Sequence, residues 1–175
     1  IARVVVATED PNPLVAGGGI AHLQAQGVEV TVGVCRVEAE RLNRPFFTRI
    51  TRHRPFVIMK VATSLDGRIA AAPGVRAAMT GAAANRLVHR QRAEVDAIAV
   101  GSETVLVDDP LLTARGAYRS RTLTRVIFDR RLRTPPSARV LSTLEAGPVI
   151  IVSTPSAADA VPDRVRALVS TGARV

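Results

Sequence analysis

The sequence predicts an α/β fold with a largely parallel sheet. Strand-like apolar runs alternate with helix-like segments along the chain, and this alternation is typical of βαβ units. Hydrophobic residues make up 47% of the chain and charged residues 22%, a balance that favours a globular protein over a disordered one. With 175 residues, the chain suits one ordinary domain or parts of two.

The first part of the chain, residues 1–52, contains alternating strand and helix patterns. A valine-rich run predicts a buried strand, and Pro11 and Pro13 end it because they force extended or turn geometry. A run of three glycines leads into a helix that Gly27 closes. In order, the expected elements are a strand over 3–7, a helix over 19–26, a strand over 28–34, a short helix over 38–42 and a basic linker over 49–55.

The second part, residues 53–175, begins with an apolar run that predicts a strand covered on both faces. Thr80 is of a type that caps helix N-termini, so a helix is expected directly after it. Both chain ends lie next to expected strands, so we expect part of a longer protein. In order, the expected elements are a strand over 56–62, a helix over 81–93, strands over 97–101, 125–129 and 148–153, and a helix over 157–170 that begins in earnest after Pro162.

The chain is strongly basic, with 24 Lys and Arg residues against 15 Asp and Glu residues and a formal net charge of +9. Lys60 is the only lysine, so almost all of this charge is arginine. Arginine can grip a phosphate through two parallel hydrogen bonds. A basic balance is nevertheless compatible with nucleic acid, with a phosphorylated small ligand or with neither.

Cysteine content and hydropathy limit the class of protein further. Cys35 is the only cysteine, which leaves no disulfide framework and no cysteine-based zinc site within the chain. No apolar run approaches the roughly 20 residues that span a bilayer, and the N-terminus lacks the pattern of a signal peptide. We therefore expect a cytoplasmic protein with no membrane partner.

Two segments carry most of the chemistry. Residues 60–68 read Lys-Val-Ala-Thr-Ser-Leu-Asp-Gly-Arg, and residues 105–115 read Val-Leu-Val-Asp-Asp-Pro-Leu-Leu-Thr-Ala-Arg. Each follows or contains an apolar run, passes through a polar turn and ends in charge. Enzymes use such turns at the end of a sheet to present reactive and binding groups.

Several motifs, in order and at the expected spacing, resemble the bifunctional riboflavin-biosynthesis deaminase/reductase family. The resemblance implies that residues 1–52 are the C-terminal remnant of a cytidine-deaminase-like α/β unit. It implies that residues 53–175 are the first half of a dihydrofolate-reductase-like, mainly parallel α/β domain. The matching segments are 4–17, 27–30 and 42–47 for the deaminase and 60–68, 92–98, 108–113 and 129–135 for the reductase.

The resemblance implies an NADPH-dependent oxidoreductase of riboflavin biosynthesis. Its reaction would be reduction of the ribosyl chain of 5-amino-6-(5-phosphoribosylamino)uracil to the ribitylamino product. The His-x-Glu and Pro-Cys…Cys segments that hold zinc in the deaminase are absent from this chain, so no metal site and no deaminase activity are expected. The implied partner is a phosphorylated pyrimidine, and the resemblance suggests a homodimer.

The resemblance also implies roles for individual residues. Lys60 is the expected catalytic residue, beside the substrate. Each residue also has a purely structural interpretation: Lys60 could extend into solvent, Thr80 could cap a helix, Asp108 could form a turn, and Arg92 could lie on the surface. Arg130 could bind the NADPH 2′-phosphate or face water. The cofactor-binding residues implied are Ala62, Thr80, Thr104, Asp108 and Arg130, and the substrate-binding residues are Arg92, Leu112 and Arg115.

Two alternatives stay open. Arg76 and Ala78 stand where the family commonly has serine and tryptophan, so the loop 74–79 favours a dihydrofolate-reductase-like enzyme with another substrate. The basic charge favours a nucleic-acid-binding module, which is less well supported because the sequence lacks a recognised nucleic-acid motif and aromatic stacking residues.

Overall fold

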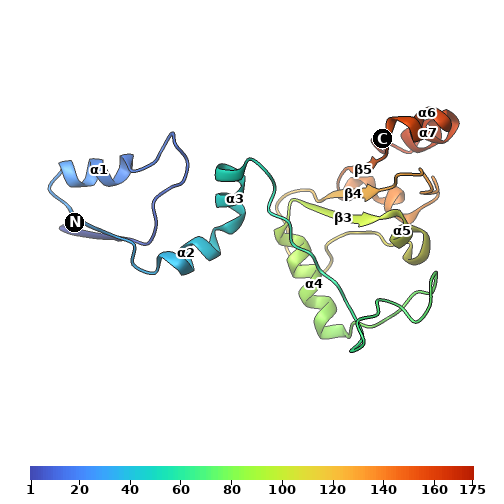
Figure 1. Ribbon diagram of the computed structural model, residues 1–175, viewed down its shortest axis with the longest axis horizontal. Helices are drawn as coiled ribbons and strands as arrows, with labels where there is room; N and C mark the ends of the chain where they lie inside the picture. Colours follow the sequence, from blue (N-terminus) through green and yellow to red (C-terminus); the bar gives the residue numbers. More distant parts are fainter. The chain divides into compact units, whose positions relative to one another are not determined.

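The computed structural model describes residues 1–175, which form two compact units, Ile1–Lys60 and Val61–Val175 (Figure 1). The first unit contains a two-stranded parallel sheet in which Arg3 pairs with Glu29 and Val6 with Val32. No side chain of this unit is fully buried. Its elements are β1 (Arg3–Val6), α1 (Gly18–Ala25), β2 (Glu29–Val32), α2 (Arg36–Leu42) and α3 (Arg44–Arg52).

The predicted strands and helices of the first unit are confirmed, including the glycine that ends α1: Gly27 has a φ of +76°, a conformation that favours glycine. The predicted linker over 49–55 is wrong, because residues 44–52 form α3. Pro45 lies in the first turn of this helix, where proline is well tolerated, and its arginines are good helix formers. Phe46, Phe47 and Ile50 follow a helical spacing within this segment, a pattern that the basic composition of residues 49–55 concealed.

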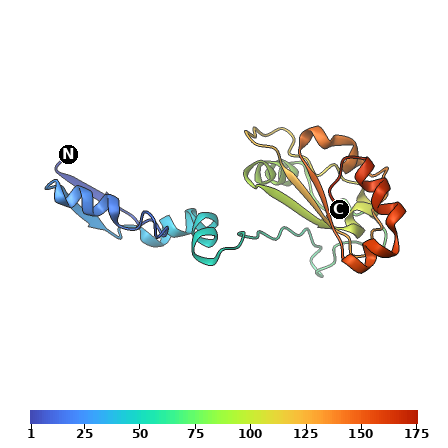
Figure 2. The ribbon, with the colours of Figure 1, turned by 90° about the horizontal axis from the view of Figure 1, so that it is seen from above.

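The second unit is built on a three-stranded parallel sheet with the order β3-β4-β5. Figure 2 shows these strands side by side, with the red helices α6 and α7 along the sheet. Arg174 forms a further bridge to Ile150 beside β5. The elements of this unit are α4 (Ala82–Glu94), β3 (Ala97–Gly101), α5 (Ser102–Asp108), β4 (Thr124–Phe128), the 3-10 helix η1 (Arg139–Ala146), β5 (Val149–Val152), α6 (Pro155–Ala160) and α7 (Pro162–Ser170).

One face of this sheet carries the hydrophobic core. The strand register places Ile98, Arg125 and Val149 in one row and Val100, Ile127 and Ile151 in the next. Alternate residues point to the same face of a sheet, so these rows face the same side. Side chains from α5, η1, α7 and the connecting loops complete the core, whose buried members are Val105, Leu112, Ile127, Leu132, Ala138, Val140, Leu141, Val149, Ile151, Leu168 and Ala173.

Arg125 lies in this core with no exposed surface. Its guanidinium donates to the Thr143 hydroxyl at 2.7 Å, to the Thr143 carbonyl at 2.8 Å and to the Gly147 carbonyl. Gly147 has a φ of +142°, and a Cβ there would clash with the Leu123 carbonyl oxygen, so only glycine fits. Arg125 therefore ties β4 to the end of η1 through backbone acceptors and not through a carboxylate.

Two predicted features of the second unit are wrong. Residues 56–62 form no strand, and the apolar side chains of this run, such as Met59 at 85% exposure, face solvent. An apolar run becomes a strand only where a neighbour pairs with its backbone, and the sheet here consists of β3, β4 and β5 alone. Residues 102–108, for which no helix was predicted, form α5. The other predicted strands and helices of this unit are confirmed, with the last helix broken at Val161 into α6 and α7.

Candidate anion-binding site

Helix α4 and the loop after α5 bring three basic side chains together. His89 and Arg92 lie three residues apart on α4 and so share a helix face. The backbone N–H of Arg115 donates to Nδ1 of His89 at 3.2 Å, and a guanidinium nitrogen of Arg115 lies 3.4 Å from Nε2 of the same ring. Arg92 donates to the Thr113 carbonyl at 3.4 Å. The structure thus unites two predicted substrate-binding residues, Arg92 and Arg115, and adds His89.

The guanidinium groups of Arg92 and Arg115 repel each other electrostatically. Neither Arg92 nor Arg115 forms a salt bridge with a carboxylate. Burial lowers the pKa of Arg92, and the nearby Arg115 lowers it further. Burial also lowers the pKa of His89, with Arg92 and Arg115 acting in the same direction. A half-buried cation cluster without an acid gains free energy when an anion enters it.

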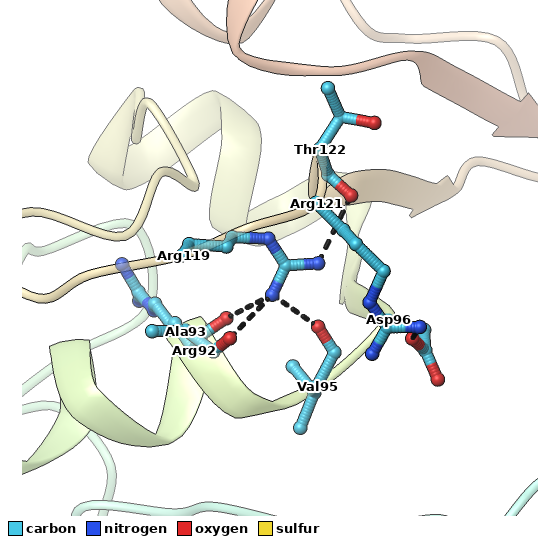
Figure 3. Close-up of polar contacts among 7 residues, drawn as sticks. All are labelled: Arg92, Ala93, Val95, Asp96, Arg119, Arg121 and Thr122. Carbon is cyan, nitrogen blue, oxygen red and sulfur yellow. Dashed lines mark hydrogen bonds and ion pairs between the residues drawn. The ribbon is translucent and has the colours of Figure 1, made fainter.

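The C-terminal end of α4 is held by Arg119 (Figure 3). One guanidinium nitrogen donates to three carbonyls at the helix end, those of Arg92 at 3.1 Å, Ala93 at 2.8 Å and Val95 at 2.5 Å. The other donates to the Thr122 carbonyl at 3.0 Å. The last carbonyls of a helix have no partners within it, so this arginine satisfies them. Arg119 therefore fixes the turn of α4 that carries Arg92, a role that sequence reasoning missed.

The loop that carries Arg115 is held in place by the buried side chain of Leu112 and by a hydrogen bond to Asp109. Leu112, for which the resemblance implies a substrate-binding role, is 2% exposed and packs in the hydrophobic core. Asp109 accepts a hydrogen bond from the backbone N–H of Arg139 at 2.8 Å. Asp109 and Leu112 both have positive φ values, 40° and 54°, so the chain turns sharply here. Leu112 thus positions the loop through its burial.

Helix α5 places two predicted cofactor-binding residues together. Thr104 and Asp108 are four residues apart and so lie one turn apart on the same face. The Asp108 carboxylate is 3.8 Å from the guanidinium of Arg76. The variant loop 74–79 therefore reaches the end of α5 and one of the predicted cofactor ligands.

A second basic surface lies at the ends of β4 and β5. A shallow cavity of about 340 Å³ is lined by Arg130 and Arg131 together with Thr154, Ser156 and neighbouring residues of α6. The turn that presents these arginines is fixed by Asp129, whose Oδ2 accepts hydrogen bonds from the Thr134 backbone and hydroxyl, both at 2.7 Å. Two cations and two hydroxyls around one hollow fit a phosphate group.

The remaining predicted site residues, Lys60, Ala62 and Thr80, make no contact with the cluster of His89, Arg92 and Arg115 among the hydrogen bonds and ion pairs of the structure. Lys60 is exposed and belongs to the first unit, whereas Arg92, Asp108 and Arg115 belong to the second. Ala62 is half-buried in an irregular segment. Thr80 does not cap α4: Gly81 occupies that position, and Thr80 contributes only its carbonyl, which accepts from the Asn85 side chain at 3.0 Å. A threonine one residue too early cannot reach the first free N–H groups of the helix.

The second unit is a parallel α/β domain in which helix α4 and the loop after α5 bring His89, Arg92 and Arg115 together. Residues 55–173 match the family described as the RibD C-terminal domain. The chain belongs to this family, since the match covers more than half of its residues.

Similar proteins agree with this assignment. The riboflavin biosynthesis protein RibD of Aquifex aeolicus is 45% identical over 151 residues, which cover 86% of this chain and 42% of the relative. The RibD of Synechocystis is 44% identical over 140 residues, covering 80% of this chain and 38% of the relative. The chain thus spans about two fifths of the length of these relatives.

Solved structures show the same fold. A RibD structure from Acinetobacter baumannii superposes with a TM-score of 0.78 at 36% identity, covering 99% of this chain and 47% of that one. A structure from Thermotoga maritima, described as a diaminohydroxyphosphoribosylaminopyrimidine deaminase/5-amino-6-(5-phosphoribosylamino)uracil reductase, superposes with a TM-score of 0.77 at 38% identity, covering 87% and 43%. The predicted α/β fold with parallel strands is therefore confirmed.

The chain has no group of three or more His, Cys, Asp or Glu side chains that could hold a metal ion. None of its helices combines the length and the apolar character needed to cross a bilayer.

Proposed function

We propose that this chain contributes the substrate side of an NADPH-dependent reductase of riboflavin biosynthesis. The reaction is reduction of the ribosyl chain of 5-amino-6-(5-phosphoribosylamino)uracil to the ribitylamino product. The observation that carries this proposal is the gathering of His89, Arg92 and Arg115 without any carboxylate partner. A similar protein from Thermotoga maritima carries this reductase name.

Arg92 and Arg115 bind the phosphate of the substrate. Arg92 keeps only one long hydrogen bond, to a carbonyl, and the side chain of Arg115 contacts only the His89 ring, so most of their donors are available. A phosphate offers acceptor oxygens to both guanidinium groups and removes the repulsion between them. Holding the phosphate fixes the attached sugar, and fixed orientation is most of what a protein contributes to hydride transfer.

NADPH supplies the hydride when it is bound. We infer that Arg130 and Arg131, with the hydroxyls of Thr154 and Ser156, hold its 2′-phosphate, because these residues line one hollow. Thr104 and Asp108 face the same way on α5 and accept or donate hydrogen bonds to ribose hydroxyls. Ala62 permits close approach of the cofactor because its side chain is small, and Thr80 lies at the entry to α4.

The first unit contributes less to this function. We infer that residues 1–52 belong to a deaminase domain and that Lys60 is the catalytic residue of the reductase. The protein acts in the cytoplasm as a homodimer on a phosphorylated pyrimidine. In a protein that carries this chain, Lys60→Ala should lower kcat by a larger factor than it raises KM.

The direct test measures oxidation of NADPH in the presence of 5-amino-6-(5-phosphoribosylamino)uracil. We expect substrate-dependent oxidation with NADPH, and we expect Arg130→Ala to weaken NADPH binding about tenfold while binding of NADH stays unchanged, since NADH lacks the 2′-phosphate. Arg90→Ala, on the exposed side of α4, is the matched control. Absence of substrate-dependent oxidation by the wild-type protein contradicts the proposal.

A second candidate is a dihydrofolate-reductase-like enzyme with another substrate. The contact between Arg76 and Asp108 favours it, because the variant loop then alters the surroundings of a cofactor ligand. An assay with dihydrofolate in place of the pyrimidine separates the two candidates. Reduction of dihydrofolate without reduction of the pyrimidine supports this alternative.

A further inference from the structure

We propose that His89 is a third phosphate-binding residue and that it also positions Arg115. The backbone N–H of Arg115 holds the His89 ring in one tautomer. This inference deepens the proposed function and rests on it. Its basis is the pair of contacts between one imidazole ring and one arginine, at 3.2 Å and 3.4 Å.

The first contact fixes the tautomer of the ring. The Arg115 backbone N–H is a donor, so Nδ1 of His89 must present its lone pair to accept this bond. A neutral imidazole carries one proton, and that proton must then lie on Nε2. The Arg115 backbone thus selects the Nε2–H form of His89, and His89 in turn holds the loop at the residue whose guanidinium binds the anion.

The second contact lacks an acceptor. Nε2–H of His89 and the guanidinium nitrogen of Arg115 are both donors and lie 3.4 Å apart. Two donors that converge at this distance cannot hydrogen-bond to each other, but one oxygen atom can accept from both. A phosphate oxygen is such an acceptor, and it gains two hydrogen bonds that the protein has already oriented.

The surrounding groups keep the ring neutral. Burial lowers the pKa of His89, and the charges of Arg92 on its own helix and Arg115 on the facing loop lower it further. The Thr113 backbone acts in the opposite direction without outweighing them. No carboxylate forms an ion pair with any member of the cluster. The neutral form is the one that can accept the Arg115 backbone hydrogen bond.

Substitutions at position 89 separate the two roles. Asparagine can place its amide oxygen near the position of Nδ1, so His89→Asn keeps the anchor for Arg115 and loses the phosphate donor. Glutamine reaches the position of Nε2, so His89→Gln keeps the donor and loses the anchor. His89→Ala loses both. His22 and His53, the other two histidines, lie in the first unit and provide matched controls as His22→Ala and His53→Ala.

The experiment measures binding of ribose 5-phosphate by titration calorimetry, with ribose as the probe that lacks phosphate. We expect the wild-type protein to prefer ribose 5-phosphate, His89→Ala to bind it about tenfold more weakly, and the asparagine and glutamine variants to fall between them. The controls at His22 and His53 should match wild type. A circular dichroism melt establishes that each variant is folded.

A second readout does not depend on any variant. The ¹⁵N shifts of the imidazole distinguish the two neutral tautomers, and we expect His89 to be in the Nε2–H form with and without ribose 5-phosphate. An Nδ1–H tautomer, or an affinity of His89→Ala within twofold of wild type, overturns the inference and leaves the proposed function intact. Equal wild-type affinity for ribose and ribose 5-phosphate overturns the phosphate site itself, and this inference with it.

Discussion

Two pairs of arginines in the second unit show opposite uses of the same side chain. The terminal guanidinium nitrogens of Arg119 and Arg125 donate to backbone carbonyls, three at the end of α4 and two at Thr143 and Gly147, and the buried Nε of each has no partner within the protein. Arg92 and Arg115 lie close together, and each makes only one long side-chain contact. The first pair completes the fold, and the second pair is available to a ligand.

This difference shows how to find a binding site in an arginine-rich chain. Net charge cannot distinguish the two pairs, because all four side chains carry the same charge. Occupancy of the donors does distinguish them, since a guanidinium whose N–H groups already donate to carbonyls has little left for a phosphate. Removing an arginine of the first pair should therefore reduce stability, and removing one of the second pair should reduce affinity.

Arg125→Met should give the largest effect. The Thr143 and Gly147 carbonyls would lose their donor in the core, so we expect the free energy of unfolding to fall by about 3 kcal/mol or more. Urea denaturation followed by circular dichroism measures this. Arg90→Met, at an exposed position of α4, should change stability by less than about 0.5 kcal/mol. A loss below about 1 kcal/mol for Arg125→Met would mean that water replaces the arginine easily.

Arg115→Ala should affect binding and leave stability nearly unchanged. The loss of a charge-assisted pair of hydrogen bonds should weaken binding of ribose 5-phosphate about 30-fold. Because Arg115 is exposed, its removal should shift the urea midpoint very little. Equal affinities of the variant and the wild-type protein would remove Arg115 from the site.

Arg119→Ala should have an intermediate effect. Three carbonyls at the end of α4 would turn to solvent, and we expect a loss of about 1–2 kcal/mol in the free energy of unfolding. Hydrogen exchange should be faster in the last turn of α4, with ribose 5-phosphate affinity reduced only a few fold. If α4 kept its protection in the variant, Arg119 would not be what fixes this helix.

Asp129→Asn should give the smallest effect, and one that depends on pH. Burial raises the pKa of the Asp129 carboxyl group, but hydrogen bonds from Thr134, Arg133 and Ser102 outweigh burial, so its pKa lies below the ordinary value. A depressed pKa stabilises the fold above the unfolded-state pKa of about 3.9 and loses this effect as the pH falls through the folded-state pKa.

The wild-type protein should therefore exceed Asp129→Asn in stability by about 1 kcal/mol at neutral pH, and the gap should close in acid. Urea denaturation at pH values from neutral to acidic follows this gap. A gap that stays constant over the whole range would mean that the ionised carboxylate does not favour the turn before Arg130.

The sequence predicted most of the fold because its signals are local. Apolar runs identified β1 to β5, and glycine marked the end of α1. The same kind of run failed over residues 56–62, because pairing depends on a neighbouring strand that the run itself does not encode. Helix α5 was missed because Val105, Leu106 and Val107 form a continuous apolar run, and such a short run does not distinguish a helix from a strand.

Two of the site residues, Arg92 and Arg115, were predicted from the sequence, and His89 and Arg119 were not. Arg92 was identified by resemblance, and Arg115 both by resemblance and by its place at the charged end of the segment 105–115. His89 was missed because its role depends on a contact with a residue 26 positions away. Its spacing of three residues from Arg92 on a predicted helix was the one available signal, since it places the two side chains on the same face. Arg119 left no sequence signal at all.

The difference between the two arginine pairs can be measured directly by following the Nε–H signals of arginine side chains in a ¹H–¹⁵N correlation spectrum. Addition of ribose 5-phosphate should shift the signals of Arg92 and Arg115 and leave those of Arg119 and Arg125 unchanged. Shifts of equal size in all four signals, or no shift at Arg92 and Arg115, would contradict the assignment of the anion-binding site.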